Sequence, residues 1–203
     1  MDQERTRQRI IEATVELHSS LGPKKTSISA VARRAGVQRL TVYRHFTDEF
    51  ALFTACSSHW LSQNPPPDPG AWMSIAEPAR RTRTALAALY GYYRRTAAML
   101  TLVYRDLDDV DALRAPVEAF QAYLDGIRDD LSKAWRPARR TRRMLEPTIA
   151  HALAFSTWSS LSGLGLSDLQ ITRLVLGWIA TTAGLARPKP AGEPETASQD
   201  QHC

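Results

Sequence analysis

The sequence predicts an all-α protein, and three observations support this fold class. Apolar residues recur at helical spacing along almost the whole chain. No stretch alternates apolar and polar residues with the period of a β-strand, and Gly and Pro separate the helical runs. Of the 203 residues, 43% are apolar, which is enough to bury the core of one large domain or two small ones.

Four helices are predicted in the first part of the chain. The first ends at Gly22-Pro23, the second begins after Thr26 as N-cap and ends at Gly36, and Asp48 is predicted to cap the fourth. The apolar faces of the four helices are Ile10, Thr14, Leu17 and Leu21; Ile28, Val31, Ala32 and Ala35; Val42 and Phe46; and Leu52, Phe53 and Cys56.

The second part of the chain begins after a loop at residues 64–70, which a helix cannot cross because of its four prolines. Three helical runs follow, and each has a proline near its expected first turn, at Pro78, Pro116 and Pro147. A last helix is opened by Ser167 or Asp168. The inward residues of the first, second and last of these helices are Leu86, Leu89, Tyr90, Tyr93 and Ala97; Val117, Phe120, Leu124, Ile127 and Leu131; and Ile171, Leu174, Val175, Trp178 and Leu185.

This pattern predicts three parts: an N-terminal domain at residues 1–47, a larger helical domain at 48–186, and a disordered tail at 187–203 that lacks apolar anchors. The polar N-terminus has no signal-peptide core, and the longest near-apolar stretch, 174–186, is shorter than the roughly 20 residues that span a bilayer. Two cysteines cannot form a disulfide framework. We therefore expect a soluble, cytoplasmic protein with no membrane partner.

The charge is distributed unevenly along the chain. The formal net charge is +5, and residues 22–46 contain six Lys and Arg side chains but no Asp or Glu. Such a local excess of positive charge favours an anionic partner.

Residues 26–46 have the layout of a helix-turn-helix. Gly36 supplies a positive φ at the tight turn, and the second helix begins at Gln38 with Val42 and Phe46 directed inward. In DNA-binding proteins the second helix of this motif enters the major groove. The alternative is a structural corner whose basic face is merely solvated, and the absence of acids weighs against it.

The outward residue types suit recognition of double-stranded DNA. Arg39 can pair with guanine, Gln38 with adenine, and Thr41 can contact a thymine methyl or a hydrogen-bond acceptor. The remaining polar and basic side chains can position the helix on phosphates. The candidate DNA-binding residues are Lys24, Lys25, Thr26, Gln38, Arg39, Leu40, Thr41, Tyr43, Arg44 and His45.

Residues 5–53 resemble the N-terminal domain of the TetR family of transcriptional regulators. The matching parts are Leu21-Gly22, Thr26-Ser27-Ile28, Val31-Ala32, Ala35-Gly36-Val37, Thr41-Val42-Tyr43-Arg44-His45-Phe46 and Leu52-Phe53. Two positions depart from the family pattern. Leu40 replaces the usual Gly, Ala or Pro, and Glu49 replaces a common lysine, which we expect to weaken a backbone contact.

The resemblance implies a homodimer formed by the last two helices, here around residues 147–162 and 168–186. A dimer would present two reading helices to a palindromic operator. The alternative is that these apolar stripes complete the core of one protomer. The candidate interface residues are Leu153, Trp158, Leu161, Leu174, Val175 and Trp178.

The resemblance also implies a small-molecule site among the middle helices. Aromatic residues and methionine line apolar ligand sites, although such residues are also ordinary core. We expect an apolar or aromatic effector that changes the affinity for DNA. The candidate ligand-binding residues are Trp60, Tyr93, Met99, Tyr104, Phe120 and Tyr123.

Other classes of function have little support in the sequence. The five histidines have no metal-ligand spacing, no phosphate-binding glycine loop or nucleophile elbow occurs, and we expect no cofactor, metal or catalytic residue. The acidic run 106–111 is interpreted as a solvated connection. Residues 136–143, with five arginines, are a solvated loop or a second anionic contact. The sequence thus favours a ligand-responsive repressor, and the alternative is a nucleic-acid-binding or architectural protein without sequence specificity.

Overall fold

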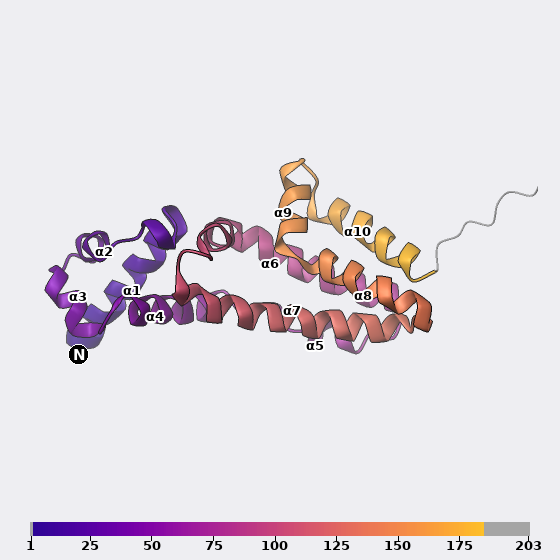
Figure 1. Cartoon of the computed structure of the whole chain (residues 1–203), viewed down its shortest axis with the longest axis horizontal. Helices are drawn as coiled ribbons and strands as arrows, with labels where there is room; N and C mark the ends of the chain where they lie inside the picture. Colours follow the sequence, from indigo (N-terminus) through magenta and orange to yellow (C-terminus); the bar gives the residue numbers. More distant parts are fainter. Residues whose placement is uncertain (1, 185–203) are drawn as a thin grey trace, which may run out of the picture.

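The computed structural model describes residues 2–184, and within this range the chain forms only helices and connecting loops (Figure 1). The all-α prediction is confirmed. The tail predicted for residues 187–203 lies outside the described residues. In chain order the elements are α1 (Asp2–Ser20), η1 (Pro23–Lys25), α2 (Ile28–Ala35), α3 (Arg39–His45), α4 (Glu49–Gln63), α5 (Gly70–Met73), α6 (Pro78–Asp106), η2 (Asp111–Leu113), α7 (Arg114–Trp135), α8 (Arg139–Leu153), α9 (Phe155–Gly163) and α10 (Asp168–Thr182).

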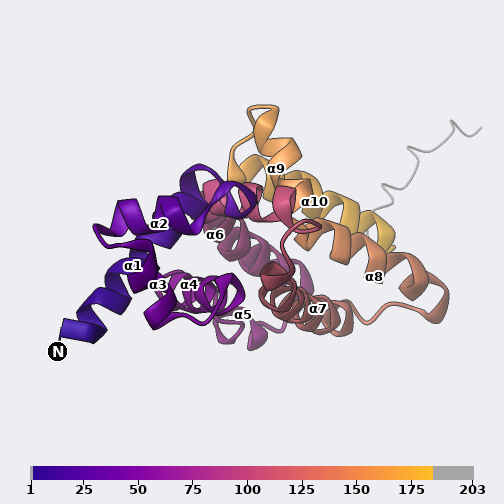
Figure 2. The ribbon, with the colours of Figure 1, turned by 60° about the vertical axis from the view of Figure 1, so that its left-hand side comes forward.

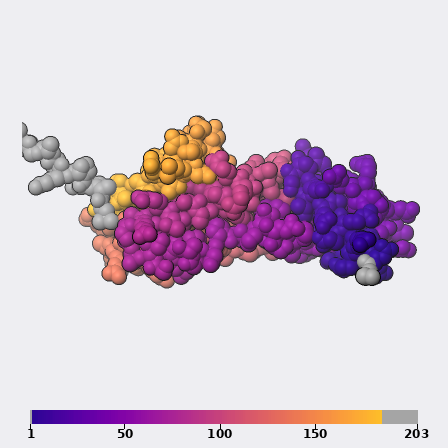
Figure 3. Space-filling view, turned by 180° about the vertical axis from the view of Figure 1, so that it is seen from behind, coloured from indigo at the N-terminus to yellow at the C-terminus, as the bar shows by residue number. Residues whose placement is uncertain are grey.

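The helices surround two separate hydrophobic cores. The first lies among α1 to α4 and is also covered by Ala112 of η2; the second lies among α5 to α10. Helix α4 contributes to both, because Leu52 and Phe53 belong to the first core whereas Trp60 packs against the second. Figures 1 and 2 place α3 at one end of the elongated molecule and α8 and α10 towards the other. The space-filling view shows α9 and α10 as a ridge on this second part (Figure 3).

Side-chain hydrogen bonds cap several helix N-termini, and the sequence predicts the capping residue at two of them, α4 and α10. Asp48 caps α4 by accepting a hydrogen bond from the backbone N–H of Ala51 at 2.7 Å. Ser167 caps α10 and forms a reciprocal capping box with Gln170. The sequence predicts Thr26 as the N-cap of α2, but the N-cap is Ser27. The Thr26 hydroxyl instead donates to the carbonyl of Gly22 at 2.9 Å.

Helix α8 differs from its predicted boundaries at both ends. It begins at Arg139, so Pro147 lies inside the helix and not in its first turn, and Arg139 to Arg143 are helical. The interpretation of residues 136–143 as a loop is therefore wrong for most of the segment. The chain then breaks at Ala154, whose ψ of 137° is extended, so residues 147–162 are parts of two helices and not of one. The Thr157 hydroxyl donates to the His151 carbonyl at 2.6 Å across this break.

A polar junction joins the end of α6 to the chain between α1 and α2. Asp106 is 2% exposed and accepts hydrogen bonds from the backbone N–H of Lys24 at 3.0 Å and from the guanidinium of Arg105. Arg105 also donates to the carbonyl of Leu21 at 3.0 Å. We call these residues, with Gly22, the α6–η1 junction. The prediction that the acidic run is only a solvated connection is wrong for Asp106, because its carboxylate is buried between the two halves of the protein.

Among the described residues, none of the helices combines the length and apolar character needed to span a bilayer.

Candidate nucleic-acid interface and ligand cavity

The turn between α2 and α3 has the geometry that the sequence predicts. Gly36 has φ 66° and ψ 39°, a left-handed conformation that costs glycine little. The backbone N–H of Val37 donates to the carbonyl of Ala32 at 2.9 Å, which closes the end of α2. Gln38 is the N-cap residue of α3, one position before the helix proper.

Helix α3 is anchored on one side and open to solvent on the other. Val42 and Phe46 are buried in the first core, as predicted. The side of α3 directed away from the core carries most of the candidate base readers. Gln38, Arg39, Leu40, Tyr43 and Arg44 are exposed, and Thr41 and His45 are half-buried. Leu40 is 63% exposed, so the large apolar side chain that departs from the family pattern is free to meet another molecule.

Arg39 is held on the exposed face by its neighbour one turn along α3. Its guanidinium donates to the Tyr43 hydroxyl at 3.2 Å and lies over the Tyr43 ring, 5.6 Å from the centroid. This hydrogen bond is the main cause that raises the pKa of Arg39, and Glu49 adds to it through its negative charge.

Helix α1 supports the motif through side chains that the sequence analysis did not single out. Arg9 donates to the carbonyl of Ala35 at the end of α2, and Arg7 lies over the ring of Phe46, 5.1 Å from its centroid. Arg34 pairs with Glu16 across α1 and α2. These contacts fix the angle of α2 and α3 on α1. They join residues far apart in sequence, so no local pattern could have revealed them.

Two further candidate DNA-binding residues, Thr26 and Lys24, have partners inside the protein. Thr26 is 6% exposed and bonded to Gly22, so its side chain is part of the first core's edge. The Lys24 ammonium pairs with Asp109 at 2.8 Å, and this contact raises the pKa of Lys24. Both lysines are exposed, and Lys24 is directed towards the loop that follows α6.

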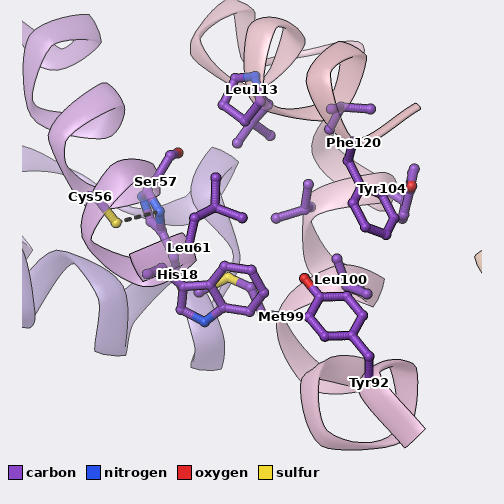
Figure 4. A pocket seen from close by; sticks show the side chains of 14 residues that line it. His18, Cys56, Ser57, Leu61, Tyr92, Met99, Leu100, Tyr104, Leu113 and Phe120 are labelled. Atoms are coloured by element: carbon purple, nitrogen blue, oxygen red, sulfur yellow. Dashed lines mark hydrogen bonds between the residues drawn. The ribbon is translucent and has the colours of Figure 1, made fainter. Parts of the chain in front are cut away.

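A cavity lies between the two halves of the protein (Figure 4). Its walls come from α1 and α4 on one side and from α6, η2 and α7 on the other, and its empty space, including the opening to solvent, is about 630 Å³. The part of this space that is open to the centre of a water-sized sphere is about 70 Å³, so a larger ligand enters only as the walls move apart. The lining side chains are His18, Cys56, Ser57, Trp60, Leu61, Tyr92, Met99, Leu100, Val103, Tyr104, Leu113, Pro116, Val117 and Phe120.

The structure brings together four of the six candidate ligand-binding residues, Trp60, Met99, Tyr104 and Phe120. The other two do not line the cavity. The Tyr93 hydroxyl donates to the carbonyl of Leu153 at 2.6 Å, and the Tyr123 hydroxyl donates to the carbonyl of Pro67 at 2.7 Å. Sequence reasoning missed the contribution of α1, because a wall built from both halves of the chain has no local signature.

The polar groups that line the cavity are uncharged at neutral pH. His18 is 3% exposed, and burial lowers its pKa to about 4 although Asp106 opposes the shift. Burial also raises the pKa of the Cys56 thiol to about 12. The Cys56 sulfur lies 3.5 Å from Nδ1 of His18, and this contact links α4 to α1 at the cavity wall.

The candidate dimer residues divide into two groups. The first group is buried in the second core of this protomer and contains Leu153, Trp158 and Val175, which are at most 4% exposed. This agrees with the alternative that the apolar stripes complete the core of one protomer. Leu161 is half-buried. The Trp158 indole N–H donates to Asp168 at 2.9 Å, inside the protomer. Leu174 and Trp178 are 41% and 36% exposed and lie beside Met144, Pro147 and His151. We call these five residues the α8–α10 face.

The fold and the exposed α3 define a helix-turn-helix protein. Residues 10–56 match the profile of a family described as bacterial regulatory proteins, tetR family. The N-terminal part of the chain is thus similar to the DNA-binding domain of this family. A comparison with curated proteins by sequence gives no match.

Several solved structures share this fold along most of their length. A TetR-like transcriptional regulator from Rhodococcus sp. RHA1 has a TM-score of 0.63 and 20% identity, covering 88% of this chain and 96% of the other. NalD, the secondary repressor of the MexAB-OprM multidrug efflux pump in Pseudomonas aeruginosa, has a TM-score of 0.56 and 22% identity, with 90% and 97% covered. FadR from Bacillus subtilis, in complex with stearoyl-CoA, has a TM-score of 0.58 and 16% identity, with 86% and 98% covered.

Proposed function

We propose that this protein is a cytoplasmic, homodimeric repressor that binds a palindromic operator through α3 and is released by a small, largely apolar effector. The single observation that carries the proposal is the position of the cavity. It lies between the elements that hold α3 and the long helices of the other half, so a ligand there touches both. Proteins that share the fold include an efflux-pump repressor and a regulator bound to stearoyl-CoA, and the apolar acyl chain of the latter ligand supports a site for a largely apolar group.

The two hydrophobic cores suggest which part of the chain has which function. We assign DNA binding to residues 1–47 and effector binding with dimerisation to residues 48–186, with α4 at the boundary. An effector changes DNA affinity only if it binds one arrangement of the two halves more tightly than the other. Because His18 and Cys56 belong to α1 and α4, a ligand that separates α4 from α6 also moves the helices that support α3.

Selection of bound DNA from a random pool tests the proposal, because a repressor of this kind should recover one palindrome. Footprinting on that sequence should give a discrete protected region. A uniform footprint with no recovered sequence would favour the alternative, a nucleic-acid-binding protein without sequence specificity. An effector screen that never shifts the complex between protein and palindrome would contradict the release step.

The Arg39→Ala variant should lose operator affinity by about 1–3 kcal/mol, or roughly 5- to 150-fold, and relax specificity at one base step. The physical reason is that the guanidinium, held by Tyr43 on the exposed face, can pair with a guanine edge. The affinity of both proteins is measured on the selected palindrome and on single-base variants of it.

Lys25→Ala is the matched control. We expect it to weaken binding to operator and random DNA alike and to lower the salt slope by about one, as for a phosphate contact. An equal loss on operator and random DNA for Arg39→Ala would remove Arg39 from the base-reading role.

A further inference from the structure

Among the described residues that line the cavity, Tyr92 is a buried side chain whose hydroxyl is directed into it. We propose that the effector is an uncharged, largely apolar molecule with a hydrogen-bond acceptor, such as a carbonyl oxygen, which the Tyr92 hydroxyl binds. This inference deepens the proposed function and rests on it, since it concerns the same cavity.

The position of Tyr92 on α6 is fixed by its neighbours. The residue is 1% exposed, and its ring packs against Tyr93 and Phe120 with centroid distances of 6.1 and 5.8 Å. Figure 4 shows the ring projecting from α6 with its oxygen turned towards the interior of the cavity. The hydroxyl is therefore presented by a rigid ring and not by a mobile side chain.

The two neighbouring tyrosines show what a buried hydroxyl in this helix ordinarily does. Tyr90 donates to the carbonyl of Ala152 at 2.7 Å, and Tyr93 donates to the carbonyl of Leu153. Within residues 2–184, the Tyr92 hydroxyl is not bonded to a carbonyl in this way and faces the cavity instead. A ligand acceptor in the cavity can therefore take from Tyr92 the hydrogen bond that protein carbonyls take from Tyr90 and Tyr93.

The ligand atom opposite Tyr92 should be an acceptor. Burial raises the pKa of Tyr92 to about 12, so the phenol keeps its proton at neutral pH and can donate it in a hydrogen bond. Buried donors are left without a partner less often than acceptors, which have two lone pairs. A carbonyl or ether oxygen is the complementary group.

The rest of the wall favours a neutral ligand. Among the lining residues in the described part of the chain there is no Asp, Glu, Lys or Arg. His18 is neutral at pH 7, and the nearest acidic influence on it, Asp106, repels an anion. A carboxylate or ammonium group would enter this apolar space without an opposite charge, which is strongly unfavourable.

Three compounds of nearly the same shape separate these alternatives: methyl naphthyl ketone, isopropenylnaphthalene and naphthoate. They present a carbonyl, a methylene and a carboxylate at the same place. Binding of each to the full chain is measured by titration calorimetry, with wild type, Tyr92→Phe and the matched control Tyr90→Phe. Tyr90→Phe removes a hydroxyl from the same helix that is bonded outside the cavity.

We expect the ketone to bind wild type most tightly and naphthoate most weakly. Tyr92→Phe should weaken ketone binding about 2- to 10-fold, the loss of one net hydrogen bond, and leave isopropenylnaphthalene unchanged. Tyr90→Phe should leave the order and the ketone affinity as in wild type.

Three outcomes overturn the inference: no binding of the ketone to wild type, tightest binding of naphthoate, or equal losses of ketone binding in the two variants. Tightest binding of naphthoate would mean that His18 takes up a proton to pair with an anion. These outcomes leave operator selection untouched, so the inference can fail while the proposed function stands. Conversely, a chain that selects no operator but binds the ketone through Tyr92 would refute only the proposed function.

Discussion

Replacing Trp178 by glutamate is expected to convert the protein from a dimer to a monomer at micromolar concentration and to lower operator affinity at least about 100-fold. Trp178 and Leu174 are the exposed apolar side chains of α10 on the α8–α10 face, and Met144 of α8, 64% exposed, extends it. Exposed apolar patches of this kind mark association surfaces. In a twofold-symmetric interface, each glutamate would be buried near its copy in the partner, where like charges without counter-ions are strongly unfavourable.

The loss of operator binding follows from the loss of the second reading helix. One helix-turn-helix contacts only one half-site, and a dimer places two of them about 34–36 Å apart on one face of DNA. Mass is measured by analytical ultracentrifugation, and affinity is measured on the selected palindrome and on an isolated half-site. The variant and wild type should bind the isolated half-site nearly equally.

Leu164→Glu is the matched control for this prediction. Leu164 follows α9, is 79% exposed, and lies outside the α8–α10 face, so the same type of change there should leave the dimer intact. If the Trp178 variant sediments as a dimer, or both variants dissociate alike, the α8–α10 face is not the interface.

Local signals predicted the helix-turn-helix closely. Gly36 takes the left-handed conformation, Val42 and Phe46 are buried, and Asp48 caps α4. Each of these features depends on residues within four or five positions of one another, where spacing and capping chemistry are informative.

The errors in α8 and α9 have a different origin. The sequence predicts a first turn at Pro147 because proline is common there, but an exposed position inside a helix also tolerates proline when water replaces the lost hydrogen bond. The break at Ala154 involves neither Gly nor Pro. The bond from Thr157 to His151 and the packing of Phe155 against Tyr93, with ring centroids 5.3 Å apart, stabilise it through tertiary contacts.

The cavity was predictable in kind but not in detail. Aromatic richness indicated an apolar site, yet Tyr90, Tyr92 and Tyr93 are close in sequence and only one of them directs its hydroxyl into the cavity. Which one does so depends on carbonyls some 60 positions away. Likewise, the sequence predicts a DNA contact for Lys24. Its partner Asp109 lies 85 positions along the chain, so no local pattern indicates the ion pair.

The α6–η1 junction leads to the second prediction with a large effect, that Gly22→Ala destabilises the fold by about 3–5 kcal/mol. Gly22 has φ 93° and ψ 157°, a region that is nearly exclusive to glycine and costs other residues about 1–3 kcal/mol. An added Cβ would also lie 2.2 Å from Nη2 of Arg105 and 2.5 Å from Oδ2 of Asp106. The methyl group therefore has to displace the buried carboxylate that joins the two halves.

Two further variants separate backbone strain from loss of the junction. Gly126→Ala, in α7 with open space around the added Cβ, should stabilise the protein by about 0.5–1 kcal/mol.

Asp106→Asn keeps Gly22 but removes the charge, and should lower the free energy of unfolding by about 2 kcal/mol at pH 7. The hydrogen bond from Arg105 is the main cause that lowers the pKa of Asp106 in the folded state. The ionised Asp106 carboxylate therefore stabilises the fold above about pH 4, the ordinary carboxyl pKa, and this stabilisation is lost as the pH falls below that value. Urea unfolding at pH 7 and at pH 3 measures all three variants. If Gly22→Ala and Gly126→Ala change stability in the same direction, or if the gap between wild type and Asp106→Asn widens at low pH, the junction does not hold the two halves together in this way.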